Sequence, residues 1–274
     1  MSMILHAAHH RIDLTHPIVM GIVNVTPDSF SDGGKFLARD AAVAHARKLA
    51  SEGAAILDIG GESTRPGAAA ASLQEELDRV IPVIEALRDD GLVLSVDTQK
   101  AEVMAEAIRA GVAMVNDVNA LQAPGAMAAV ASFNVAVCLM HMQGTPRTMQ
   151  ADPKYENVTL QVGTFLGERA LACVKAGIAA NRIVIDPGFG FGKTLAHNLT
   201  LVKELPALAK LGYPILAGLS RKSTIGAVTG RESSHRLAGS LAAHLIAAQN
   251  GARILRVHDV AETVDALKVL KAMT

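Results

Sequence analysis

Eight short apolar runs recur along this chain, and each is followed by a longer segment with helical periodicity. Alternating strand and helix patterns are typical of repeated βα units around a parallel sheet. Because the runs are almost continuously apolar, they predict strands that are buried on both faces. The predicted strands are Ile18–Asn24, Ala55–Ile59, Leu92–Asp97, Met114–Val118, Val135–Met140, Ile183–Asp186, Ile215–Leu219 and Ile254–Val257.

Eight βα units favour an α/β protein with a closed (β/α)8 TIM barrel of eight parallel strands. An open doubly wound sheet is the alternative. No linker or change in composition divides the 274 residues, so residues 1–274 are predicted to form a single domain. Before the first strand, Ile4–Leu5 and Arg11–Leu14 are predicted to form a short hairpin that caps the bottom of the barrel.

The charge balance narrows the class of protein. The chain has 26 basic and 26 acidic side chains, which is not the basic excess of a typical nucleic-acid-binding protein. Its apolar stretches are too short or too interrupted to span a membrane, since Leu237–Ala248 contains Ser240 and His244. Cys138 and Cys173 form no C-x-x-C motif, as expected in a reducing compartment, so we expect a cytoplasmic protein.

Polar residues gather where the predicted strands end. In a barrel these ends converge on one mouth, where the long Gly-, Pro-, Ser- and Thr-rich connections Thr26–Arg39, Gly60–Ser72 and His141–Tyr155 also begin. The pattern therefore predicts one pocket, with helix capping as the alternative for any single residue. The residues are Asn24, Asp58, Asp97, Asn116, Asp117, His141, Asp186, Ser220–Ser223, Arg256 and His258.

Two chemistries are indicated within this set. Asp97, Asn116 and Asp186 combine two carboxylates with an amide, which suits a flat heterocycle with N–H edges. Aromatic residues in the same loops suit either stacking on such a ring or ordinary loop packing; they are Phe30, Phe36, Phe189 and Phe191.

The second chemistry is cationic and lies beside helix N-termini, which predicts a phosphate or diphosphate subsite. Its members are Arg65, Arg221, Lys222, Arg256 and His258. Asn24 together with diphosphate oxygens suits Mg²⁺, which keeps waters and takes few protein ligands.

One segment imitates a nucleotide-binding loop. Pro187–Thr194 ends in Gly-Lys-Thr, but proline stands where the P-loop pattern requires its first glycine. Its glycines also miss the G-x-G-x-x-G spacing of a dinucleotide-binding turn. The segment is therefore not predicted to hold a nucleotide.

The motifs together resemble those of the dihydropteroate synthase family, of bacterial type, from residue 24 to residue 259. They are the runs 24–34 (NVTPDSFSDGG), 58–67 (DIGGESTRPG), 95–98 (SVDT), 116–117 (ND), 140–144 (MHMQG), 186–193 (DPGFGFGK), 220–223 (SRKS) and 256–259 (RVHD).

This resemblance implies a transferase of folate biosynthesis that is inhibited by sulfonamides. It would condense p-aminobenzoate with 7,8-dihydropterin-6-ylmethyl diphosphate, with Mg²⁺ as cofactor, to give 7,8-dihydropteroate and diphosphate. The family is usually a homodimer, and the apolar helical segments Leu237–Ala248 and Val264–Leu270 could supply that surface.

The resemblance also implies roles for individual residues. The pterin pocket would comprise Asp97, Asn116, Met140, Asp186, Phe191, Gly218 and Lys222. The p-aminobenzoate subsite would comprise Phe30, Thr64, Pro66 and Ser223. Asn24 would bind Mg²⁺, and the diphosphate contacts would be Arg65, Arg256 and His258.

The implied mechanism is an SN1-like displacement in which Asp97 stabilises the cationic pterin methylene. Arg65, Arg256, His258 and Lys222 complete the predicted catalytic set. Three alternatives remain open: a methyltetrahydrofolate methyltransferase domain, a silent pterin binder without turnover, and a phosphosugar lyase barrel.

Overall fold

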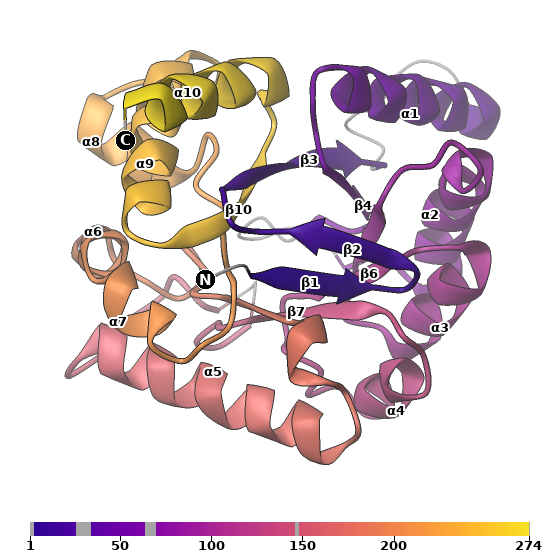
Figure 1. Cartoon of the computed structure of the whole chain (residues 1–274), viewed down its shortest axis with the longest axis horizontal. Helices are drawn as coiled ribbons and strands as arrows, with labels where there is room; N and C mark the ends of the chain where they lie inside the picture. The colour runs from indigo at the N-terminus through magenta and orange to yellow at the C-terminus, as the bar shows by residue number, and fades with distance from the viewer. Residues whose placement is uncertain (1–2, 26–33, 64–69, 146–147, 274) are drawn as a thin grey trace.

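The computed structural model describes residues 3–25, 34–63, 70–145 and 148–273, without the side chains of residues 34–37. Within these ranges, eight parallel strands form a closed barrel in the order β10-β3-β4-β5-β6-β7-β8-β9. Helices surround the barrel, as Figure 1 shows. The chain is therefore a TIM barrel, and the open-sheet alternative is wrong.

The strands lie close to the predicted apolar runs. Their bounds are β3 Ile18–Asn24, β4 Ile56–Gly60, β5 Leu94–Asp97, β6 Met114–Asp117, β7 Ala136–Met140, β8 Ile183–Asp186, β9 Ile215–Ala217 and β10 Ala252–Val257.

The helices are α1 Gly34–Ser51, α2 Leu73–Leu87, α3 Ala101–Ala110, α4 Ala126–Ala131, α5 Val158–Lys175, α6 Leu195–Lys203, α7 Leu205–Ala209, α8 Ser223–Thr229, α9 Leu237–Gln249 and α10 Val260–Met273. Two short 3-10 turns lie at Ala180–Arg182 and Ser233–His235. Among the described residues, no helix is long and apolar enough to cross a bilayer.

The helices differ from expectation in two places. Helix α1 begins at Gly34, so the last six residues of the segment Thr26–Arg39, which was predicted to be a loop, are helical. Each strand was expected to be followed by one helix, but β8 and β9 are each followed by two. The end of the second predicted loop is right, because Ser72 and Glu75 form a capping box that starts α2.

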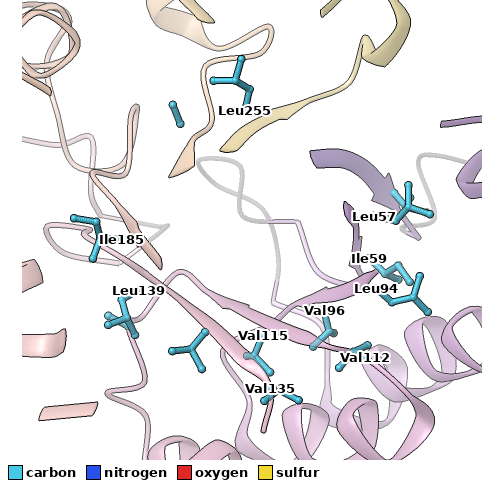
Figure 2. Packing of buried hydrophobic residues seen from close by; sticks show 14 of the residues in the cluster. Leu57, Ile59, Leu94, Val96, Val112, Val115, Val135, Leu139, Ile185 and Leu255 are labelled. Carbon is cyan, nitrogen blue, oxygen red and sulfur yellow. The ribbon is translucent and has the colours of Figure 1, made fainter. Parts of the chain in front are cut away.

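Each strand contributes one face to an inner core and one to an outer core. The outer core lies between strands and helices and includes Leu57 and Ile59 of β4 and Leu94 and Val96 of β5 (Figure 2). Since alternate residues of a strand point to opposite faces, Asp58, Ser95 and Asp97 point into the barrel.

The predicted N-terminal hairpin closes the barrel at the end opposite the mouth. Strands β1 (Ile4–Ala7) and β2 (His10–Asp13) pair antiparallel, and Figure 1 shows them lying across the barrel. Leu5, Ala7 and Leu14 pack on the inner core that Met20, Ile56, Met114, Ala136, Cys138, Val184, Leu216 and Ile254 form. This apolar plug leaves the carboxyl ends of the strands as the polar end of the barrel.

Candidate active site

Strand alternation brings the residues predicted for the pterin pocket to one mouth. In each strand, the residue two positions after an inner-core residue points to the same face. The side chains at the ends of the strands therefore point into the barrel, above the apolar plug. The register supports this arrangement, because Asp97 pairs with Asn116 and Met140 pairs with Asp186 on neighbouring strands. The inward positions are Asn24, Asp97, Asn116, Met140, Asp186, Gly218 and Arg256.

Arg256 crosses the barrel interior and joins two carboxylates. Its Nε donates to Asp58 Oδ2 over 2.6 Å, and its Nη2 donates to Asp97 Oδ2 over 2.7 Å. Asn116 Nδ2 also donates to Asp58 Oδ2, over 2.9 Å. Burial raises the pKa of Asp97, while the Arg256 charge opposes that rise. Asp58 Oδ2 therefore accepts from both Asn116 and Arg256. The sequence placed Asp58 at the predicted pocket but assigned it no individual role.

The sequence also indicates that Asp58 needs a partner. An aspartate in the middle of an apolar strand, on the same face as its inward neighbours, must be paired to be stable inside a barrel. Asp58 is fully buried, and its Oδ1 has no hydrogen-bond partner among the described residues. The identity of its partner could not be predicted, because Arg256 lies on the last strand.

A second group of charged side chains at the mouth consists of Asp186 and Lys222. Asp186 Oδ1 accepts a hydrogen bond of 2.7 Å from the backbone N–H of Gly188. The Lys222 ammonium donates to the carbonyl oxygen of Phe189 and lies 4.7 Å from the centroid of the Phe191 ring. Burial raises the pKa of Asp186 and lowers the pKa of Lys222 to about 8. Of the two phenylalanines, Phe189 packs in the outer core, and only Phe191 reaches the site.

Segment Ser220–Ser223 is held by the helices that follow it. Arg221 has a φ of 56°, its N–H donates to Ser240 Oγ, and its guanidinium pairs with Asp259. The predicted phosphate-binding cation Arg221 is thus already neutralised. His258 donates its backbone N–H to Ser220 Oγ, and its Nδ1 lies 3.0 Å from the same oxygen. Ser223 is exposed at the first position of α8.

The two residues of the Asn116–Asp117 pair have different functions. Asn116 faces the barrel interior, whereas Asp117 accepts hydrogen bonds of 2.7 Å from the N–H groups of Asn119 and Leu121. Leu121 has a φ of 56°, so Asp117 stabilises a left-handed turn rather than a ligand.

His244, in α9, supports the segment that carries Lys222. Its Nε2 accepts the backbone N–H of Leu219 over 3.2 Å, and its Nδ1 donates to the carbonyl oxygen of Ser240 over 2.9 Å. These contacts require a neutral ring, and burial lowers its pKa to about 4. His244 is therefore a neutral hydrogen-bond bridge in the core.

This bridge predicts a pH-dependent stability. Between pH 6.5 and 4 the unfolded chain binds a proton at His244 that the folded chain does not, so the His244 contribution decreases as pH falls. The largest change in unfolding free energy that His244 can cause in this way is about 3 kcal/mol. We expect the stability advantage of wild type over His244→Gln, measured by urea unfolding, to shrink between pH 7 and pH 4.5. A constant difference would contradict the assignment.

Asn24 is the residue predicted to bind Mg²⁺. Asn24 is partly exposed at the end of β3 and offers an amide oxygen. The described part of the chain contains no group of three or more His, Cys, Asp or Glu side chains able to hold a metal. With Asn24 as the ligand, the site fits an ion that takes its other ligands from substrate phosphates and water, as Mg²⁺ commonly does.

Four predicted site residues lie outside the described residues: Phe30, Thr64, Arg65 and Pro66. Their roles, like those of the other site residues, stay predictions.

The fold and the mouth match one family of enzymes. Residues 20–258 match the family model described as pterin binding enzyme. The chain is 52% identical to dihydropteroate synthase of Haemophilus influenzae, over 98% of both chains.

Solved structures give the same result. The chain matches Xanthomonas albilineans dihydropteroate synthase with 4-aminobenzoic acid at a TM-score of 0.94 and 57% identity, covering 100% of this chain and 98% of that one. The same enzyme in complex with 7,8-dihydropteroate gives 0.90 and 55%, covering 98% of each. A Yersinia pestis dihydropteroate synthase with a sulfonamide drug complex gives 0.94 and 50%, covering 99% of each. The chain belongs to the dihydropteroate synthase family of pterin binding enzymes.

Proposed function

We propose that this barrel is a transferase of folate biosynthesis that makes 7,8-dihydropteroate from p-aminobenzoate and 7,8-dihydropterin-6-ylmethyl diphosphate. The observation that carries the proposal is the convergence of Asp97, Asn116, Asp186 and Lys222 on one barrel mouth. Relatives crystallised with 4-aminobenzoic acid and with 7,8-dihydropteroate support it. The high identity to synthases favours this activity over the methyltransferase and phosphosugar lyase alternatives.

The described floor of the site is suited to a ligand with N–H edges. It contains three carboxylates, Asp58, Asp97 and Asp186, and two cations, Arg256 and Lys222. With all five ionised, one negative charge is unbalanced in a buried environment. Donor groups of a pterin, and positive charge that develops on it, are therefore favoured there.

The reaction we propose begins when the bond between the pterin methylene carbon and the diphosphate oxygen breaks. Diphosphate leaves with the electron pair, and the amine nitrogen of p-aminobenzoate then bonds to the cationic methylene and loses a proton. A carboxylate at Asp97 stabilises the cation more than the neutral substrate, which lowers the barrier. Arg65, Arg256 and His258 are proposed to bind the leaving diphosphate.

Mg²⁺ is proposed to be bound by Asn24 and diphosphate oxygens, where it would neutralise charge on the leaving group. Phe30, Thr64, Pro66 and Ser223 are proposed to bind p-aminobenzoate, the subsite for which sulfonamides would compete. A Yersinia pestis relative crystallised with a sulfonamide drug complex supports this last proposal.

The function is tested by measuring diphosphate release and dihydropteroate formation together. We expect both products in equal amounts when both substrates and Mg²⁺ are present, and no dihydropteroate when p-aminobenzoate or Mg²⁺ is omitted. Pterin binding without release would instead support the silent-binder alternative. Dihydropteroate formation without diphosphate release would contradict the proposed displacement.

We further propose a cytoplasmic homodimer. Ile246 of α9 and Val269 of α10 are exposed large apolar side chains, and these two helices contact each other. The described cysteines, Cys138 and Cys173, are free and buried, which suits a reducing compartment.

A further inference from the structure

Lys193 is a buried lysine that the proposed reaction does not use, and burial lowers its pKa to about 7. It ends the Gly-rich segment that imitates a P-loop, yet its side chain turns inward and is only 3% exposed. Its ammonium lies within hydrogen-bond distance of four acceptors: His141 Nδ1 at 3.0 Å, and the carbonyl oxygens of His141, Gly188 and Phe191 at 3.2, 3.0 and 2.9 Å.

These contacts join the ends of two barrel strands. His141 follows β7, while Gly188 and Phe191 belong to the segment after β8. The two segments lie so close that a Cβ at Gly188 would be 1.9 Å from the His141 carbonyl oxygen. Since carbonyl oxygens that face one another repel, the ammonium between them stabilises this close approach.

The segment after β8 also contacts Lys222. The carbonyl oxygen of Phe189 accepts from the Lys222 ammonium, and the Phe191 ring lies 4.7 Å from it. Lys193 binds the carbonyl oxygen of Gly188, the residue before Phe189, and the carbonyl oxygen of Phe191 itself. The position of Lys222 therefore depends on the curvature that Lys193 imposes.

His141 is held in one protonation state by this arrangement. An ammonium is only a donor, so the Nδ1 that faces it must accept. Burial, followed by the Lys193 charge, lowers the pKa of His141 to about 3. The imidazole packs edge-on against Phe165, with ring centroids 5.0 Å apart. His141 directly follows Met140, which is predicted to line the pterin pocket.

We propose that Lys193 is a positioning residue for pterin recognition: its ammonium acts as an internal cation that shapes segment 187–192 and so fixes Phe191 and Lys222. The proposal rests on the proposed function, since Lys222 is its pterin contact. Lys193 itself touches no substrate in this role.

Lys193→Met tests the proposal, because methionine keeps an unbranched chain but removes every donor. We expect the KM for the dihydropterin diphosphate to rise about tenfold or more. The KM for p-aminobenzoate should stay within about twofold. The matched control is Lys203→Met, an exposed lysine at the end of α6, which should behave as wild type.

A purely structural role predicts a different result. It would lower the melting temperature and the active fraction while leaving both KM values at the wild-type level, and that outcome in a folded variant would overturn the proposal. Lys193→Arg keeps the buried charge but not the compact ammonium, so it provides a second test if the methionine variant fails to fold. We expect a smaller rise in the same KM.

Calorimetry separates this proposal from the proposed function. Binding of 6-hydroxymethyl-7,8-dihydropterin can be measured without turnover, and we expect Lys193→Met to weaken it relative to wild type and Lys203→Met. If wild type makes no dihydropteroate, the function fails but the binding comparison still tests Lys193. Equal affinities in the three proteins would overturn the positioning role.

Discussion

Replacing Asp97 with alanine is expected to lower kcat by about 100- to 1000-fold, the usual loss when one preorganised electrostatic contact is removed from an active site. In the proposed mechanism, positive charge develops on the pterin methylene as diphosphate leaves. The Asp97 carboxylate is fixed by Arg256 at 2.7 Å, so it stabilises that charge without reorganising. Steady-state kinetics with both substrates saturating measures the effect.

The stability of the same variant should change much less. Arg256 retains its ion pair with Asp58 when Asp97 is removed, so the buried guanidinium is not left without a partner. Asp97→Asn keeps the shape of the side chain without its charge and should show most of the loss in kcat. Asp89→Ala, at an exposed carboxylate outside the site, is the control. Near-normal turnover in Asp97→Ala would refute its electrostatic role.

The largest effect on stability is expected from Arg256→Met. Asp58 is fully buried, and Arg256 supplies its ion pair at 2.6 Å. Removing one partner of a buried ion pair leaves an uncompensated charge, which typically costs about 3–5 kcal/mol of unfolding free energy. Urea unfolding at pH 7 measures this cost.

A double variant identifies the cause. Arg256→Met combined with Asp58→Asn removes both charges of this pair, so we expect it to recover part of the lost unfolding free energy. The remaining loss is expected from Asp97, which also loses Arg256 as its partner. Arg253→Met, on the same strand, is a matched control because Arg253 forms no ion pair among the described residues. If the single and double variants are equally stable, the Asp58 charge does not cause the loss.

The fold was predicted from the sequence because its signals are local. Apolar runs of strand length and helical periodicity are each contained within a few neighbouring residues. Because eight βα units follow one another along the chain, few topologies other than the barrel are possible. Local signals misplaced boundaries, as at the start of α1, and missed the second helix after β8 and after β9.

The residues of the mouth were predicted for a related reason. A residue at the end of a parallel strand lies at the mouth whatever its neighbours are, so position along the chain was sufficient for Asp97, Asn116 and Asp186. The reaction itself was indicated by the resemblance to a family, since carboxylates and cations at a barrel mouth suit many chemistries.

Pairing within the site was decided only by the tertiary structure. Arg256 binds Asp58 across 198 residues of sequence, and Lys193 binds His141 across 52. Such contacts depend on barrel closure and on the face to which each side chain points, and no local pattern encodes the partner. The sequence therefore determined the barrel and the polar residues at its mouth, whereas the structure decided which charges neutralise one another, because burial makes an unpaired charge too costly.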